Sequence, residues 1–365
     1  MTTTATTPAA TNPAGTEPAA VNPAGASARE IAAEANGHEP DITTMPLSKG
    51  ITAGLRKALE NDPKVLLIGE DIGKLGGVFR VTEGLQKDFG EHRVIDSPLA
   101  EAGIVGTSIG MAVRGYKPVI EIQFDAFIYP AYSQIVTQLA KLHNRTRGAE
   151  KMPVVIRVPF GGGIGSPEHH SESPETVFAH HAGLKIISPS NAHDAYWMIQ
   201  EAIASPDPVM FFEPKRRYWL KGDVDRANRG LDGWHAQVVS PGTDVTLVAY
   251  GPTMPQAQDA VAAAREEGTS VELIDLRSLN PIDFATIEAS VKKTGRLVVL
   301  HEGAVFLGLG SEIAARITER CFYHLEAPVI RVGGFHTPYP GSKLEEDYLP
   351  DLDRVLHGVD RALAY

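Results

Sequence analysis

The first residue that could do chemistry is Glu101, which is followed by no charged side chain until Arg114. Ser97 and Pro98 predict the cap and the first position of a helix. A capping box would place an acidic residue at position 100, which is Ala100, so capping does not explain Glu101. A buried carboxylate loses water that favours its charged form, which suits it to share a proton with a ligand nitrogen. The alternative is a buried ion pair with an arginine or lysine.

Three glycines follow Glu101 at helical spacing. Gly103, Gly106 and Gly110 are three and four residues apart and therefore share one face of a helix. A helical glycine costs up to about 1 kcal/mol relative to alanine, so three on one face indicate that another helix or a ligand approaches the backbone. We therefore expect Glu101 to open a buried, tightly packed helix.

Aromatic residues follow an apolar strand between Glu121 and Pro130. Ligands of parallel sheets bind beyond the carboxyl ends of the strands. A flat ring such as Phe127 could stack there on a flat heterocycle, and packing in the core is the alternative.

A glycine-rich loop at residues 161–165 leads to His169 and His170, and His180 and His181 follow. The loop lacks the Gly-Lys-Ser/Thr ending of a P-loop, so we expect its glycines to permit close approach and movement. Four histidines also suggest zinc, but adjacent residues on an extended chain point to opposite sides. A histidine that handles protons is the preferred interpretation.

Short β-branched runs alternate with helical patterns in two parts of the chain. The expected strands are 65–68, 119–122, 154–158, 185–187 and 209–212 in the first part, and 245–248, 271–274, 297–300 and 329–332 in the second. Such alternation is typical of parallel sheets covered by helices. The sequence therefore predicts an α/β protein with two doubly wound domains.

The composition also predicts the domain boundaries. Residues 1–41 are mostly Ala, Thr, Pro, Gly and Asn, which predicts a disordered tail, either a flexible leader or a stretch before a true start at Met45. We place the first domain at 42–220, a polar linker at 221–242 and the second domain at 243–365.

Charge and hydropathy exclude several classes of function. Lys and Arg number 34 against 45 Asp and Glu, and 34 − 45 = −11 gives no electrostatic basis for binding nucleic acid. No apolar stretch reaches the ~18 residues of a membrane span. The lone Cys321 cannot form an internal disulfide and is expected to be a buried apolar residue. We expect a cytoplasmic protein.

Several motifs together resemble one family from about Leu47 to the C-terminus. They are Gly69-Glu70-Asp71, Gly76-Gly77-Val78-Phe79-Arg80, Asp96-Ser97-Pro98-Leu99-Ala100-Glu101, Glu121-Ile122-Gln123-Phe124, His170-Ser171, Phe212-Glu213-Pro214-Lys215 and Asp275-Leu276-Arg277. Their order and spacing resemble those of the beta subunits of 2-oxo acid dehydrogenase complexes, most of all the branched-chain type. This resemblance implies a transketolase-like pyrimidine-binding domain followed by a transketolase C-terminal domain.

The resemblance implies a thiamine diphosphate enzyme with α2β2 subunits and the cofactor between them. Glu101 corresponds to the carboxylate that hydrogen-bonds N1′ of the aminopyrimidine and thereby favours the tautomer that deprotonates C2. Phe127 corresponds to an aromatic residue against the pyrimidine, where branched-chain relatives often have Tyr, so a hydroxyl contact is not carried over. Leu99 and Gln123 map onto cofactor-lining positions, and His170 onto a histidine that assists acyl transfer to the lipoyl sulfur.

The resemblance also implies metal ions and partners. The sequence has no Gly-Asp-Gly motif, so Mg²⁺ and the diphosphate are expected to be held mainly by the alpha subunit. A structural potassium ion is implied near Met152, Val154, Val155, Ala202, Ser205 and Asp207, although Ser205 stands where relatives can have Asp. The C-terminal domain is expected to contact the basic subunit-binding domain of the dihydrolipoyl acyltransferase core. The surface for this contact could be formed by the acidic residues at 345–347, Asp351 and Asp353. The alternative is that these charges are only a solvated face of the protein.

The implied reaction is the oxidative decarboxylation of a branched 2-oxo acid such as 4-methyl-2-oxopentanoate, with acyl transfer to a lipoyl arm. The alternatives are a pyruvate or acetoin dehydrogenase, and a non-catalytic scaffold subunit. A scaffold would need none of Glu101, Phe127 and His170, and their joint presence argues against it.

Overall fold

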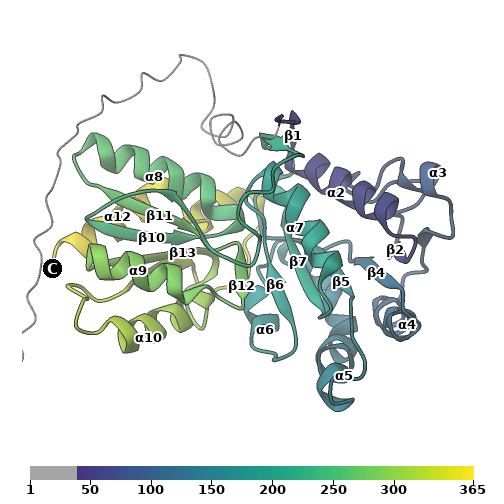
Figure 1. The fold of residues 1–365 in the computed structure, drawn as a ribbon. Coiled ribbons are helices and arrows are strands. Elements are labelled where there is room, and N and C mark those ends of the chain that lie inside the picture. Colours follow the sequence, from purple (N-terminus) through teal and green to yellow (C-terminus); the bar gives the residue numbers. More distant parts are fainter. Residues whose placement is uncertain (1–38) are drawn as a thin grey trace, which may run out of the picture. The chain divides into compact units, whose positions relative to one another are not determined.

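The computed structural model describes residues 39–365, and the chain from Asp41 to Tyr365 forms one compact unit. Of the tail predicted at residues 1–41, positions 1–38 lie outside the described residues. Two large sheets and a small two-stranded sheet make up this unit, and helices cover both faces of each large sheet (Figure 1). The predicted α/β fold with two mostly parallel sheets is confirmed.

The first sheet has seven strands in the order β12-β6-β7-β5-β4-β2-β3. Its strands are β2 (Val65–Gly69), β3 (Val94–Asp96), β4 (Lys117–Glu121), β5 (Val155–Phe160), β6 (Lys185–Ile187), β7 (Val209–Pro214) and β12 (Ser278–Asn280). All neighbours pair in parallel except β12, which is antiparallel to β6.

Both faces of the first sheet are buried, because successive strand side chains point to opposite sides. One face packs on α2 (Leu47–Asn61) and α7 (Ala192–Ala204), with strand residues such as Val65 and Leu67 in that core. The other face packs on α4 (Glu101–Val113), with Ile68 and Ile120 in that core. The apolar runs seen in the sequence are thus strands that are covered twice.

The second sheet has five strands in the order β14-β13-β10-β11-β9. They are β9 (Gln237–Ser240), β10 (Val245–Ala249), β11 (Val271–Asp275), β13 (Leu297–Ala304) and β14 (Ile330–Gly334). Helices α8 (Met254–Glu266) and α12 (Leu352–Leu363) cover one face, and α9 (Phe284–Thr294) and α10 (Leu309–Cys321) cover the other (Figure 1). Cys321 is buried in this second core as expected.

Short elements complete the fold. They are β1 (Ile42–Pro46), β8 (Lys221–Asp225), α3 (Leu85–Phe89), α5 (Ala140–Arg145), α6 (Glu175–Ala179) and α11 (Glu345–Tyr348), with 3-10 turns at Asp125–Ala131, Glu168–His170, Lys215–Arg217, Gly251–Thr253 and Ser342–Leu344, and a π-helical turn at Gln134–Leu139. The stretch 221–242 contains two strands: β8 pairs with β1, and β9 pairs with β11. No helix within residues 39–365 is long and apolar enough to span a membrane.

Candidate functional site

Neighbouring parallel strands of the first sheet end at one edge. Gly69 of β2 pairs with Asp96 of β3 and with Glu121 of β4, so the segments that follow these strands begin side by side. Strand β5 pairs in parallel with β4 and ends at Phe160, before the glycine-rich loop. The carboxyl edge of a parallel sheet is where ligands usually bind, and the predicted site residues Leu99, Glu101, Gln123, Phe127 and His170 all follow strands that end there.

Helix α4 begins at Glu101, three residues later than the sequence predicts. Ser97 does not cap this helix: its N–H donates to the carbonyl of Gly69 (2.8 Å), which continues the sheet, and its Oγ donates to the carbonyl of Pro98. Ala100, whose backbone is not helical, then precedes the helix. The predicted helix start was wrong, and the correction places Glu101 in the first turn beside the ends of the strands.

The Glu101 side chain is 8% exposed. No arginine or lysine within residues 39–365 forms an ion pair with it. The alternative of a buried ion pair within this chain is therefore wrong. The helix around it is less enclosed than predicted, since Gly103 and Gly110 are exposed and a Cβ at Gly110 would meet no atom within 4 Å. The glycine face of α4 is therefore largely open within this chain, and the close approach of another helix or a ligand to it stays a prediction.

Glu70, which directly follows β2, is a second carboxyl group at the site. It is 7% exposed, and its Oε1 has no hydrogen-bond partner in the described part of the chain. Burial raises the pKa of Glu70, and the charge of Glu101 raises it further. Sequence reasoning assigned no role to Glu70, although its place just beyond a fully buried strand was a usable signal.

Gln123 ties the ends of two strands together. Its Nε2 donates to Oδ2 of Asp71 (3.1 Å) and to the carbonyl of Glu70 (3.4 Å). Leu99, from the loop before α4, is 81% exposed. An exposed leucine beside buried carboxyl groups gives this edge an apolar surface next to a polar one.

Aromatic rings hold His170 at the same edge. Phe124 stacks on His170 with ring centroids 3.9 Å apart, and Phe127 meets His170 edge-on at 5.1 Å. The ring centroid of His169 lies 6.4 Å from that of Phe127 and 4.3 Å from that of His170. The Nδ1 atom of His170 is buried and has no partner among residues 39–365, so this imidazole keeps an unused hydrogen-bonding position.

A buried ion pair fixes the loop that carries His170. Asp125 accepts from the backbone N–H of Glu172 (2.8 Å) and from Nζ of Lys215 (2.9 Å), and both side chains of the pair are fully buried. The N–H of Gly161 donates to the carbonyl of Glu172 (2.9 Å). Sequence reasoning missed Asp125 and Lys215 because their partners are far apart in the chain.

Comparisons with known proteins decide the family. Residues 43–219 match the transketolase pyrimidine binding domain, and residues 235–355 match the transketolase C-terminal domain. The chain is 60% identical over 327 residues to the pyruvate dehydrogenase E1 component subunit beta of Leifsonia xyli, covering 90% of this chain and 97% of the relative. This chain belongs to the E1 beta subunits of 2-oxo acid dehydrogenases. It is therefore a subunit of an oxidoreductase.

Other relatives of this beta subunit carry different substrate names. It is 52% identical to the 3-methyl-2-oxobutanoate dehydrogenase subunit beta of Mycobacterium tuberculosis (88% and 93% of the two chains) and 43% identical to the 2-oxoisovalerate dehydrogenase subunit beta of Pseudomonas aeruginosa (86% and 93%). A solved structure described as a split gene transketolase, inactive beta4 tetramer, matches with TM-score 0.74 at 22% identity over 88% and 98% of the chains, which shows the fold alone.

The glycine-rich loop of this beta subunit lies close to side chains of the segment that follows β14. A Cβ at Gly162 would lie 1.7 Å from Oη of Tyr339, and the N–H groups of Gly163 and Gly165 donate to Glu345 (2.8 and 2.9 Å). The expected close approach to the loop glycines is thus confirmed, and the groups that approach them are side chains of the same chain. Glu345 is 5% exposed, so it cannot belong to the predicted acidic docking surface, whereas Glu346 is exposed and pairs with Arg216.

The remaining predicted ligands lie apart from this edge. His181 contacts Oη of Tyr132 through Nε2 (2.5 Å), and no group of three or more His, Cys, Asp or Glu that could hold a metal occurs within residues 39–365. At the predicted potassium segment, the N–H of Met152 donates to the carbonyl of Pro206, and Lys185 binds Ser205 (3.3 Å) and Asp207 (3.0 Å). The structure therefore brings Met152 near the segment 202–207, where a lysine already supplies positive charge.

Proposed function

We propose that this chain is the beta subunit of a thiamine diphosphate-dependent 2-oxo acid dehydrogenase. In this proposal it acts with an alpha subunit in an α2β2 heterotetramer and transfers an acyl group to the lipoyl arm of a dihydrolipoyl acyltransferase core. Family membership supports the reaction class, and the match to a pyrimidine binding domain supports the cofactor. The observation that carries the proposal is a buried Glu101 without a cationic partner at the open edge of the first sheet.

The residues at this edge fit the pyrimidine end of the cofactor. Glu70 and His170 each keep a buried polar atom without a partner in residues 39–365, which a polar heterocycle could satisfy. Leu99 and Phe127 would pack against the ring, and Gln123 would line it. When bound, thiamine diphosphate would supply the carbon nucleophile that attacks the 2-oxo group.

Glu101 would hold a proton between its carboxyl group and the pyrimidine nitrogen N1′. Glu101 is buried and forms no ion pair with an arginine or lysine within residues 39–365, so its carboxyl group is left to pair with a ligand. His170 would handle a proton during acyl transfer, because Phe124 fixes its ring while its Nδ1 stays unpartnered among the described residues.

The metal ions of the proposed enzyme divide between the chains. This sequence has no Gly-Asp-Gly motif, so Mg²⁺ and the diphosphate would be held mainly by the alpha subunit. A structural potassium ion at Met152, Val154, Val155, Ala202, Ser205 and Asp207 stays a prediction, which the short distance from Lys185 to Ser205 and Asp207 does not favour.

Two substrate classes remain candidates. The sequence motifs favour a branched 2-oxo acid, and relatives named for 3-methyl-2-oxobutanoate and 2-oxoisovalerate support that assignment at 52% and 43% identity. The relative at 60% identity is named for pyruvate and favours the alternative. Relative kcat/KM for pyruvate and 4-methyl-2-oxopentanoate, measured on the assembled enzyme, decides between them.

The central test is Glu101→Gln in the assembled enzyme. The amide keeps the size of the side chain but cannot share its proton in the same way, so decarboxylation should fall by roughly 10²-fold or more. Cofactor binding, followed by calorimetry, should persist. Glu91→Gln, at an exposed position away from the site, is the control and should keep full activity. Wild-type turnover in Glu101→Gln would end the proposed role.

A further inference from the structure

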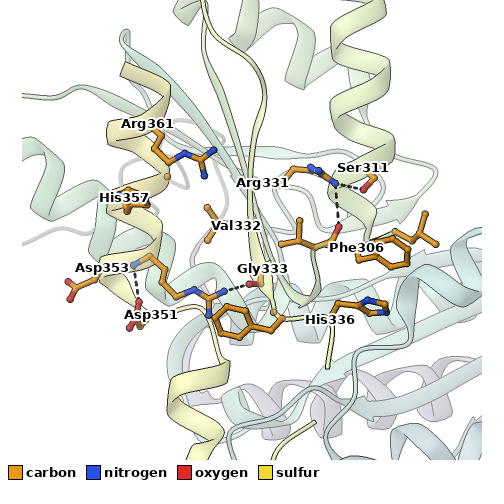
Figure 2. A pocket seen from close by; sticks show the side chains of 16 residues that line it. Phe306, Ser311, Arg331, Val332, Gly333, His336, Asp351, Asp353, His357 and Arg361 are labelled. Carbon is orange, nitrogen blue, oxygen red and sulfur yellow. Dashed lines mark hydrogen bonds between the residues drawn. The ribbon is translucent and has the colours of Figure 1, made fainter. Parts of the chain in front are cut away.

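A pocket of about 820 Å³ lies in the C-terminal half of the chain, away from the edge that carries Glu101. It is formed by the end of β14, the loop from Val305 to Leu307, the start of α10 and one face of α12. Figure 2 shows this pocket, with Val332 of β14 between the flanking side chains. Its volume falls in the range of small-molecule sites, and it lies along the edge strand β14 and the loop that follows this strand.

Three arginines line this pocket without a carboxylate partner in residues 39–365. Arg331 donates to Oγ of Ser311 (2.7 Å) and to the carbonyl of Val305 (3.4 Å), which are neutral groups. Arg354 donates to the carbonyls of Tyr348 (2.9 Å) and Gly333. The lining also holds Asp351 and Asp353, so three arginines face two carboxylates in a chain of net charge −11, and the excess positive charge favours an anionic occupant.

Arg361 is the least engaged of the three arginines. It is exposed on α12 and makes no hydrogen bond or ion pair within the described residues. Figure 2 shows its side chain extending from α12 toward the strand. A guanidinium group in this position can donate two parallel hydrogen bonds to a carboxylate or a phosphate.

Aromatic rings also line this pocket. Phe306 is 59% exposed and stacks on His336 with centroids 4.3 Å apart. Phe335 is 51% exposed and lies under the guanidinium of Arg354, 4.4 Å from its centroid. Exposed rings beside unpaired arginines match a ligand that has both a charged and an apolar part.

A purely structural role explains only part of this arrangement. β14 is an edge strand, and Arg354 covers its Gly333 carbonyl, as charged side chains often do at sheet edges. Of the two carboxylates in the lining, Asp351 already caps α12 by accepting from the N–H of Arg354 (2.8 Å). Edge protection accounts for neither the free Arg361 nor the exposed Phe306.

We propose that this pocket binds a small organic oxyanion, a carboxylate or a phosphate monoester, that carries an apolar or aromatic group. The oxyanion lies against Arg361 and Arg354, and the apolar part lies against Phe335 and Phe306. The site belongs to the C-terminal half of the chain and does not depend on the function proposed above.

Calorimetry on the purified full chain tests the proposal with four probes. Phenyl phosphate and phenylacetate share a ring and differ in the oxyanion, whereas benzyl alcohol lacks the charge and inorganic phosphate lacks the ring. At least one of the two organic anions should bind at least roughly tenfold more tightly than both control probes, and the tighter of the pair identifies the oxyanion. Similar affinity for benzyl alcohol, or no measurable binding of either organic anion, overturns the proposal.

Variants locate the binding. Arg361→Gln should weaken the preferred anion roughly tenfold, while Arg265→Gln, at an exposed arginine outside the pocket, should leave it unchanged. Phe306→Ala should weaken the organic anions and leave inorganic phosphate unaffected. Unfolding temperatures of all three variants show whether they are folded. Unchanged affinity in both Arg361→Gln and Phe306→Ala places the ligand elsewhere and refutes the site.

Discussion

Buried charged side chains show what the sequence can and cannot predict about single residues. Glu101 stood out in the sequence because it opens a helix without other charges, and the structure places it beside Glu70 at a strand end. By contrast, Arg157 lies inside an apolar run and gave no signal. Its guanidinium binds Glu121 (2.6 Å) and Glu213 (2.6 and 3.0 Å), two residues on neighbouring strands. Such partners meet only after the sheet has formed, so no local pattern reveals them.

Glu175 predicts how stability depends on pH. It is 1% exposed, accepts a hydrogen bond from Oη of Tyr250 (2.6 Å), and burial raises its pKa to about 7. Between the usual value near 4.5 and about 7, the folded chain therefore keeps a proton that the unfolded chain has lost. Stability from this group is present at low pH and is lost as the pH rises through that window, by up to about 3 kcal/mol.

Replacement of Glu175 by Gln should remove this loss. The unfolding free energies of wild type and Glu175→Gln are measured in urea at several pH values. From pH 5 to pH 8, the free energy of the variant relative to wild type should rise by up to about 3 kcal/mol. Taking the difference cancels other buried groups that titrate in the same range. Glu267→Gln, at an exposed position on the same chain, should run parallel to wild type. Parallel curves for Glu175→Gln as well would show that the group is ionised in the folded chain.

At the scale of elements, helix ends were predicted less well than the strands. Ser97 and Pro98 form a good local start signal, but the N–H of Ser97 is taken by the carbonyl of Gly69 as the sheet continues. Tertiary hydrogen bonding therefore delays the helix to Glu101. The glycines of α4 illustrate a similar limit. The spacing of these glycines correctly predicted that they share one face of α4. The spacing does not show whether the group that approaches this face belongs to the same chain or to another molecule.

Two helical glycines should respond to alanine in opposite directions. Gly54 of α2 faces α7, and a Cβ there would lie 2.4 Å from Cγ2 of Ile199 and 2.6 Å from the carbonyl oxygen of Tyr196. Gly54→Ala should therefore destabilise the chain by about 1–3 kcal/mol, because the two helices must separate. Gly110→Ala meets no atom within 4 Å and should stabilise α4 by up to about 1 kcal/mol.

Urea unfolding of the isolated full chain measures both effects. Equal stabilisation by the two substitutions would contradict the close packing of α2 against α7. Equal destabilisation would show that the glycine face of α4 is covered in the isolated chain.

At the scale of the whole molecule, the order of apolar runs was enough to predict two parallel sheets with helices on both faces. Short edge strands escaped prediction, because β8, β9 and β12 are three to five residues long and carry little periodic signal. β12 also joins the first sheet although it lies in the second half of the chain. The two halves therefore interlock through a strand that sequence reasoning placed on neither sheet.

The exposed edge of the first sheet predicts that the isolated chain is incomplete. Leu99 is 81% exposed, Gly103 and Gly110 of α4 are exposed, and the polar atoms of Glu70 and His170 lack partners in residues 39–365. We expect the full chain alone, given thiamine diphosphate and Mg²⁺, to show at most about a few per cent of the turnover of the assembled enzyme. The reason is that the isolated chain lacks the groups that would hold the cofactor in its reactive position. Addition of an alpha subunit that carries Gly-Asp-Gly should restore turnover, and sedimentation should then report a heterotetramer.

Leu99→Asp separates assembly from folding in this experiment. The exposed side chain contributes little to the isolated chain, so its unfolding free energy should change by no more than about 0.5 kcal/mol. In the mixture with the alpha subunit, however, a charge at this apolar position should lower restored turnover and cofactor affinity together, because it would be buried without a partner. Lys87→Asp, at an exposed position on α3, changes charge away from this edge and should restore turnover like wild type. Full turnover by the isolated wild-type chain would mean that the site is complete without a second subunit, and the division of the cofactor between two chains would then be wrong.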